Sequence, residues 1–344
     1  MALTIAVLSQ KGGTGKTTLV RSLADVCERL GMDVVAVDAD PQGNLSDYFD
    51  TDPDAQPTLG EVLQGHVRAA DAVHGQVIPA NLRLAEAELA LAGKIGREVT
   101  LRNALRDLKR NRDLILIDCP PTLGLLTVNA LVAATHAILS TEAQYFSLQG
   151  MEQAVEVLDL ARDSLNPELE LLGVCLNIAN MRTRHARQTL EALRERFGDK
   201  VFRTVIRQSI VYAESAERGV PILDYRPAKG ADYLSLAGEI LRRLSKHELL
   251  ERLDELSVEL APGGPGSVRA QRQPEREPKP VAPQEIHPEP VPESATSHPE
   301  PPEAEEEAPP EADEEAPPEA EEETPPQAEE VRVESRQAPL AEPR

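Results

Sequence analysis

A glycine-rich segment near the start of the chain carries the residue types that bind phosphate. It reads Lys11-Gly12-Gly13-Thr14-Gly15-Lys16-Thr17-Thr18 and lies between an apolar run typical of a buried strand and a helical pattern. Glycines let backbone N–H groups turn inward around phosphate oxygens, and the first turn of a helix adds positive potential. We expect Lys16 to neutralise the β- and γ-phosphates of ATP, and Thr17 to bind Mg²⁺ through its hydroxyl.

Carboxylates follow two other apolar runs of the chain. Asp38 and Asp40 lie at the end of the run that reaches Val37, and Asp118 closes the run Leu114-Ile115-Leu116-Ile117. An aspartate at the end of a strand, in a chain with a phosphate loop, is typical of residues that hold Mg²⁺ through water, and we expect this role for Asp118. Asp38 and Asp40 are expected at the mouth of the phosphate site.

The phosphate loop contains a second lysine, Lys11, although one lysine and one metal ion suffice to bind a triphosphate within a subunit. With this lysine the loop resembles the deviant Walker A family, whose members include ParA/Soj, MinD and the nitrogenase iron protein. The segment from Asp38 to Asn44 resembles the DxDPQGN segment of that family, and Asp118-Cys119-Pro120-Pro121 resembles the start of its DCPPSLGLLT segment. Similarity to Soj-like ParA proteins covers almost all of residues 1 to 250.

The resemblance implies roles for individual residues. Lys11 is expected to reach across a dimer interface to the partner's phosphates and to stabilise charge there, as an arginine finger does. Asp40 is expected to orient the attacking water, Asp38 to lie near the water shell of the metal, and Asn177 to contact the base. The protein is therefore expected to be an ATPase that forms a homodimer when ATP is bound.

Short apolar runs alternate with helical patterns along the first three quarters of the chain. This order predicts a doubly wound α/β fold, a mostly parallel sheet with helices on both faces, and the loop makes it a P-loop fold. Strands are expected at residues 3–8, 33–37, 113–117, 137–141, 171–177 and 201–205. Helices are expected at residues 17–30, 101–110, 123–134, 148–164, 187–197 and about 230–260.

Composition changes abruptly near residue 261. Residues 1–261 hold apolar blocks that can bury a core, which predicts a single ATPase domain. Residues 262–344 hold 7 basic and 22 acidic residues, and so carry −15 of the net charge of −23. From residue 301 they repeat PPEAEEEA, PPEADEEA and PPEAEEET, which predicts a disordered, extended tail. Such a tail could solubilise the protein, screen DNA from a basic surface or dock a basic partner.

The cysteines and the apolar segments bear on the compartment. Cys27, Cys119 and Cys175 are far apart and lack metal-ligand spacing, so we expect them to be buried thiols. The start of the sequence has no signal-peptide pattern, and no stretch reaches eighteen apolar residues. These features predict a cytoplasmic protein.

Short ParA proteins bind duplex DNA without sequence preference through basic side chains. The resemblance makes Arg182, Arg184, Arg187, Arg207 and Arg218 candidates for this role. The family's IPRNVRLSEAP stretch aligns with residues 206–216, where Gln208 and Val211 replace two arginines. The basic surface is therefore either moved to neighbouring positions or is an ordinary solvated face.

The resemblance also implies a cellular role: an ATP-bound dimer on the nucleoid, a ParB-like partner that stimulates hydrolysis, and segregation of a chromosome, a plasmid or another cargo. The alternative is a MinD-like membrane switch. This would need a terminal amphipathic helix rich in lysine, and the Pro- and Glu-rich C-terminus does not provide one, so no membrane partner is expected. A metallocluster enzyme would need paired cysteines, and only Cys119 falls near the nucleotide motifs.

Overall fold

The computed structural model describes residues 2–143 and 147–262. The chain divides into two units, Met1–Ala282 and Pro283–Arg344. The predicted tail from residue 263 onward, including the whole second unit, lies outside the described residues.

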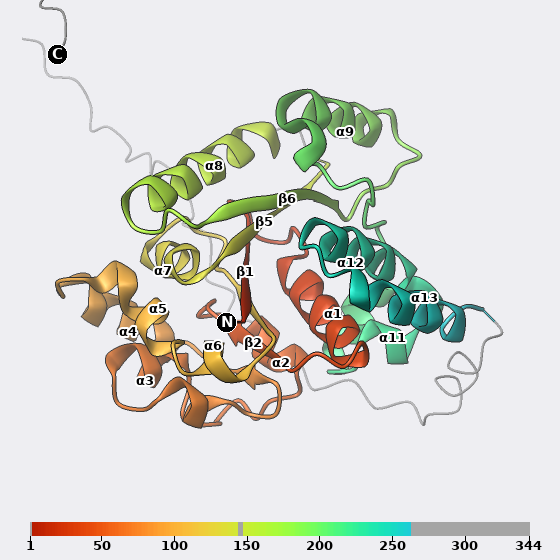
Figure 1. Cartoon of the computed structure of the whole chain (residues 1–344). Helices are drawn as coiled ribbons and strands as arrows, with labels where there is room; N and C mark the ends of the chain where they lie inside the picture. The colour runs from red at the N-terminus through yellow and green to blue at the C-terminus, as the bar shows by residue number, and fades with distance from the viewer. Residues whose placement is uncertain (1, 144–146, 263–344) are drawn as a thin grey trace, which may run out of the picture. The chain divides into compact units, whose positions relative to one another are not determined.

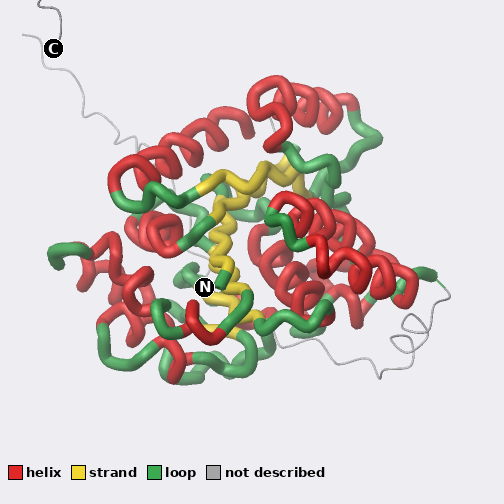
Figure 2. The backbone as a smooth tube through the Cα atoms, in the orientation of Figure 1, coloured by secondary structure: helices red, strands yellow, loops and turns green. Residues whose placement is uncertain are grey.

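A parallel sheet forms the centre of the first unit (Figures 1 and 2). In the described part of the chain its order is β3-β2-β4-β1-β5-β6. With β1 in the middle, the loop that follows β1 lies where the strand order reverses, which is where doubly wound folds bind ligands. The strands are β1 Leu3–Leu8, β2 Val34–Asp38, β3 Val77–Ile78, β4 Leu114–Asp118, β5 His136–Glu142 and β6 Glu170–Asn177.

Helices cover both faces of the sheet, and each face has its own apolar core (Figure 1). Alternate residues of β1 enter opposite cores: Ile5 packs with α1 and α12, whereas Ala6 packs with the helices between α3 and α8. This is why the central strands are apolar throughout. The helices are α1 Lys16–Arg29, α2 Asn44–Tyr48, α3 Leu59–Gln64, α4 Arg83–Ala92, α5 Thr100–Ala104, α6 Leu108–Asn111, α7 Leu125–Ala133, α8 Ser147–Ser164, α9 Arg184–Phe197, α10 Val211–Glu217, α11 Ile222–Tyr225, α12 Ala231–Arg243 and α13 Leu250–Glu259.

The structure confirms the predicted fold class and five of the predicted strands. The strand predicted at 201–205 is wrong: this segment bonds to the edge of β6 only through an isolated bridge from Val201 and single N–H groups such as that of Phe202. β3 and the helices α2, α3, α4, α10 and α11 were not predicted from the sequence.

Two predicted helices are interrupted. The helix predicted at 230–260 is two helices, α12 and α13, because Ser245 has a φ of 57°, which a right-handed helix cannot accommodate. The helix predicted at 101–110 is likewise split into α5 and α6. All three cysteines are buried free thiols, as predicted.

Candidate nucleotide-binding site

The loop between β1 and α1 positions a buried lysine. Gly13 and Gly15 have φ values of 77° and 75°, in the left-handed region that glycine tolerates best. Lys16 is buried, and its Nζ lies 3.0 Å from Ser9 Oγ and 3.4 Å from the carbonyl oxygen of Lys11. The ammonium group therefore lies at the N-terminus of α1, where the phosphate oxygens of a nucleotide could replace these two acceptors.

Two serines that the sequence analysis did not select brace the loop. Ser9 Oγ accepts a hydrogen bond from Thr14 Oγ1 at 2.9 Å and donates to the carbonyl of Lys11 at 2.7 Å. Ser140 Oγ, on β5, donates to the carbonyl of Thr14 at 2.9 Å. Serine is common at strand ends, so its type alone gave no signal.

Asn177, the last residue of β6, is buried against the same loop. Its Nδ2 donates to the carbonyl of Gly15 at 3.2 Å. A Cβ atom at Gly15 would lie 2.6 Å from this nitrogen, so the contact requires glycine. The amide thus holds the loop, whereas its contact with a base stays a prediction.

Thr17 and Asp118, both predicted to hold the metal, lie together. Thr17 Oγ1 donates to Asp118 Oδ2 at 2.7 Å, because β1 and β4 pair with Val7 opposite Asp118. Asp118 is 1% exposed, and its Oδ1 has no hydrogen-bond partner among the described residues. A buried carboxylate oxygen without a partner, beside a threonine hydroxyl, fits a hard cation such as Mg²⁺.

The electrostatics of this position also favour a cation. Burial raises the pKa of Asp118 to about 8, and the charge of Asp38 adds to the rise. Burial raises the pKa of Asp38 to about 6. The two residues are opposite each other in the register of β2 and β4. A divalent cation would favour the ionised form of both carboxyl groups.

Asp38 anchors the segment that follows it. Its Oδ2 accepts hydrogen bonds from the backbone N–H and the hydroxyl of Ser46, at 2.8 and 2.7 Å, and its Oδ1 accepts one from the N–H of Asp40 at 3.2 Å. Asp38 therefore fixes the first turn of α2, a role that the sequence analysis did not foresee. Asp40 is half-buried, and its Oδ1 accepts from the N–H of Gln42 at 3.0 Å. The actions of Asp38 and Asp40 on metal and water stay predictions.

Lys11 lies at the mouth of the site with its side chain directed to β5. Its Nζ forms an ion pair with Oε1 of Glu142 at 2.8 Å. The backbone of Lys11 belongs to the loop, since its carbonyl accepts from Ser9 and Lys16. Glu142 was not among the predicted site residues.

The predicted DNA-binding arginines differ in what holds them. Arg182, Arg184 and Arg187 are exposed, and their guanidinium groups make no hydrogen bond or ion pair with any residue that the structure describes. They stand at and just before the start of α9. These three cations are available to a partner.

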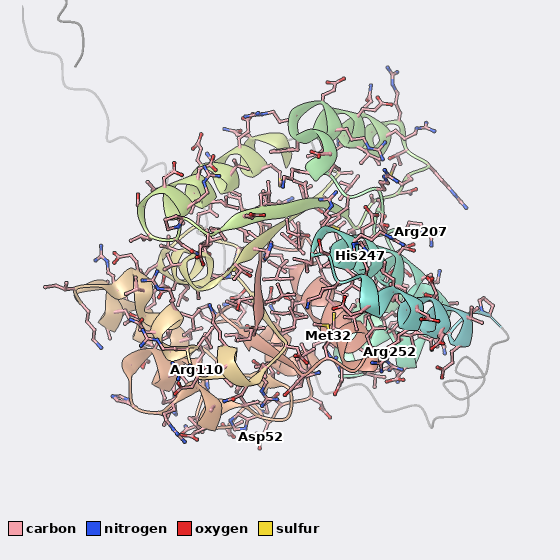
Figure 3. The ribbon with its side chains drawn as sticks, in the orientation of Figure 1. Met32, Asp52, Arg110, Arg207, His247 and Arg252 are labelled. Atoms are coloured by element: carbon pink, nitrogen blue, oxygen red, sulfur yellow. The ribbon has the colours of Figure 1, made fainter. Side chains whose placement is uncertain are left out.

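Arg207 and Arg218 are held by other side chains. Arg207 lies at the surface beside α12 (Figure 3), and its Nη2 is 2.7 Å from Oδ1 of Asp232 while its Nε bonds to both carboxylate oxygens. Arg218 lies over the ring of Tyr225, 5.5 Å from its centre. Their predicted role with DNA would require them to leave these partners.

A hollow of about 1080 Å³ between α9 and α12 is lined by further arginines. Arg194, Arg203 and Arg242 are exposed, and their guanidinium groups have no partner within residues 2–143 and 147–262. Glu239 lines the same hollow, but its carboxylate accepts hydrogen bonds from the N–H groups of Arg203 and Thr204. The hollow therefore offers three cations to an anionic partner.

A second hollow, of about 700 Å³, lies beyond Asn177 on the chain that follows β6. Gln208 and Tyr212 line one part of it, and Asn180 and Lys229 line others. Its lining begins at Ala179, two residues after Asn177, which bonds to Gly15 of the loop.

Comparison with known proteins agrees with this geometry. A family model described as "AAA domain" matches residues 2–171. Sporulation initiation inhibitor protein Soj of Bacillus subtilis is 37% identical over 249 residues, which cover 70% of this chain and 98% of Soj. Chromosome partitioning protein ParA of Caulobacter vibrioides is 36% identical over 250 residues, 70% of this chain and 94% of that protein. The chain belongs to the ParA/Soj family of P-loop ATPases.

Solved structures support the same assignment. The septum site-determining protein MinD of Pyrococcus horikoshii, complexed with Mg-ADP, has a TM-score of 0.59 and 30% identity, and the match covers 70% of this chain and 96% of that one. Cobyrinic acid a,c-diamide synthase of Mycobacterium smegmatis, with a bound ATP analog and magnesium, has a TM-score of 0.59 and 34% identity over 64% of this chain and 93% of that one. The nucleotide site of this ParA/Soj member is thus built on a fold that related proteins use for nucleotides.

Within residues 2–143 and 147–262, no helix has the length and apolar character needed to cross a membrane. The same residues contain no group of three or more His, Cys, Asp or Glu side chains placed to hold a metal ion.

Proposed function

We propose that this protein is a nucleotide switch that positions DNA: with Mg·ATP bound it forms a homodimer that binds duplex DNA without sequence preference, and hydrolysis lets the subunits separate. ATP and Mg²⁺ are its cofactors. The observation that supports this most strongly is that the loop holds two lysines with different exposure. Lys16 is buried at the start of α1, whereas the side chain of Lys11 is 60% exposed at the mouth of the site. We assign Lys16 to the phosphates bound by its own subunit and exposed Lys11 to the phosphates bound by a second copy of the chain.

Each residue of the site has a task in this scheme. The backbone of Gly12 to Gly15 and the ammonium of Lys16 hold the phosphates, and the base enters the hollow near Asn177 and Gln208. Thr17 and Asp118 hold Mg²⁺, which neutralises charge on the β- and γ-phosphates. Asp40 orients the attacking water. Lys11 of one subunit reaches the phosphates of the other and stabilises the charge that develops there.

DNA binding is assigned to the unpaired arginines. Arg182, Arg184 and Arg187 precede or begin α9, and the hollow lined by Arg194, Arg203 and Arg242 follows its other end. Each contact with a phosphate releases counterions, so binding should weaken steeply with salt. A ParB-like partner on DNA would stimulate hydrolysis and release, which makes chromosome or plasmid segregation the cellular role and the nucleoid the place of action.

The test is binding of a fluorescent duplex of arbitrary sequence, measured by anisotropy with a slowly hydrolysed ATP analogue, with ADP and without nucleotide, over a salt series. The proposal expects binding with the analogue alone, with an affinity that falls as salt rises. Equal binding in all three states would contradict the switch. Binding to anionic vesicles in place of DNA would favour a MinD-like function.

A further inference from the structure

An ion pair between Lys11 and Glu142 joins the phosphate loop to the end of a neighbouring strand. Lys11 Nζ lies 2.8 Å from Glu142 Oε1. Glu142 is the last residue of β5, which is hydrogen-bonded to β1 with Leu8 opposite Leu139. The loop and the carboxylate are therefore held side by side by the sheet, not by the ion pair itself.

The two partners differ in their freedom to move. The side chain of Glu142 is 16% exposed and that of Lys11 is 60% exposed. The carbonyl of Lys11 is fixed by Ser9 and Lys16, so its backbone cannot follow a movement of its side chain. Four rotatable bonds separate the ammonium from that backbone, so the lysine head can swing while the acid stays in place.

A second contact places the start of α8 against the same loop. A Cβ atom at Gly150 would lie 2.6 Å from Oε1 of Gln10, the residue before Lys11. Gly150 is the fourth residue of α8, so the first turn of this helix lies beside the loop. Gln10 therefore lies against α8 of its own subunit, while Lys11 is paired with Glu142.

We propose that Glu142 is a positioning residue that holds Lys11 within its own subunit, and that release of this ion pair is one of the costs of forming the ATP-bound dimer. The inference rests on the proposed function, in which Lys11 acts on the partner's phosphates. One ammonium cannot keep a 2.8 Å contact with Glu142 and also reach across an interface. Glu142 therefore disfavours dimerisation until the phosphates at the partner subunit bind Lys11 more strongly than Glu142 does.

A double-mutant cycle on the full-length chain tests this inference. Glu142→Gln keeps the shape of the side chain and removes its charge. An exposed ion pair contributes about 0.2–1 kcal/mol, and two pairs open for each dimer, so the dimer Kd with a slowly hydrolysed ATP analogue should fall by roughly 2- to 30-fold. In a Lys11→Ala background the same substitution should leave the Kd unchanged. Sedimentation velocity over a protein concentration series gives these constants.

Glu152→Gln is the matched control. Glu152 forms an ion pair with Arg196 at 3.3 Å, and its loss changes the net charge by the same amount. It should leave the dimer Kd unchanged. An equal effect of Glu152→Gln, an undiminished effect of Glu142→Gln without Lys11, or weaker pairing of Glu142→Gln would overturn the inference.

A second readout separates this inference from the proposed function. Without nucleotide, loss of the carboxylate should make Lys11 more reactive toward acetic anhydride, measured by peptide mass spectrometry with exposed Lys94 as reference. Unchanged reactivity would show that the pair does not hold Lys11 in solution and would overturn the inference alone. A wild-type chain that stays monomeric with the ATP analogue would overturn the proposed function, and with it this use of Lys11.

Discussion

The phosphate edge of the sheet and the arginine surface around α9 are built in different ways. At the phosphate edge, Lys16, Asp38 and Asp118 are buried and are held by neighbours that the strand register brings together. At the arginine surface the side chains are exposed. They differ in whether a carboxylate or an aromatic ring contacts the guanidinium group. A buried site can be predicted from its motif, whereas an exposed site depends on pairings that the motif does not contain.

The largest effect should come from the buried lysine of the loop. Lys16→Ala removes the ammonium that is predicted to face the β- and γ-phosphates. ATP affinity should therefore fall by about 100-fold or more, since a charge-assisted contact in a buried site would be lost. Isothermal titration calorimetry measures the affinity. Lys94→Ala, which removes an exposed lysine elsewhere, should have no effect. An unchanged affinity in Lys16→Ala would mean that the loop does not bind phosphate.

The metal position should give the next largest effect. Asp118→Asn keeps the hydrogen bond from Thr17 possible but removes the charge, and Mg²⁺-dependent ATP turnover should fall by roughly 10²-fold. The same substitution at exposed Asp163, which is paired with Arg162, is the control and should leave turnover unchanged. Full turnover in Asp118→Asn would exclude this carboxylate from the metal site.

The same carboxyl group predicts a pH dependence. Because burial raises the pKa of Asp118 to about 8, the nucleotide-free protein keeps a proton there that the unfolded chain loses near pH 4. This contribution to stability is full below about pH 4 and is lost as pH rises to about 8. Asp38, whose pKa is about 6, loses its proton at lower pH. In EDTA, the fall in Tm between pH 6 and 8 should therefore come from Asp118. Asp118→Asn should remove this fall, and a slope that persists in the variant would assign it to another group.

The smallest effect concerns the arginine surface, and it sharpens the contrast between paired and unpaired cations. Replacing Arg194, Arg203 and Arg242 together by Gln should reduce the slope of log affinity for duplex DNA against log salt by about 3, because each lost phosphate contact removes about 0.9. Arg207→Gln should leave the slope nearly unchanged, since Asp232 already neutralises this cation, whereas loss of one phosphate contact would change it by about 0.9. The reverse order would show that DNA displaces Asp232 and that the paired arginines form the surface.

The sequence predicted the centre of the molecule better than its edges. Continuous apolar runs identify β1, β2, β4, β5 and β6 because each is buried on both faces. β3 was not predicted because it is only two residues long. Residues 201–205 were mistaken for a strand because they are apolar where they pack beside β6. Length and burial are properties of the fold that local composition does not separate.

The same limit applies within the site. Motif residues such as Lys16, Thr17 and Asp118 were found because their chemistry restricts their type. Glu142 was not, because its partner Lys11 is 131 residues away in the chain. Ser46 was not, because its bond to Asp38 forms only when the turn between β2 and α2 folds back. The role of Glu142 depends on the pairing of β1 with β5, which only the folded chain provides.

The most direct test of the central claim is ATP turnover per subunit as a function of protein concentration, with Mg²⁺ and without partner proteins. If Lys11 of one subunit acts on the phosphates of the other, specific activity should rise with concentration and level off once dimers predominate, and Lys11→Ala should remove the rise. A specific activity that is constant over a 100-fold range of dilution, or full turnover in Lys11→Ala, would contradict hydrolysis that depends on a second copy of the chain.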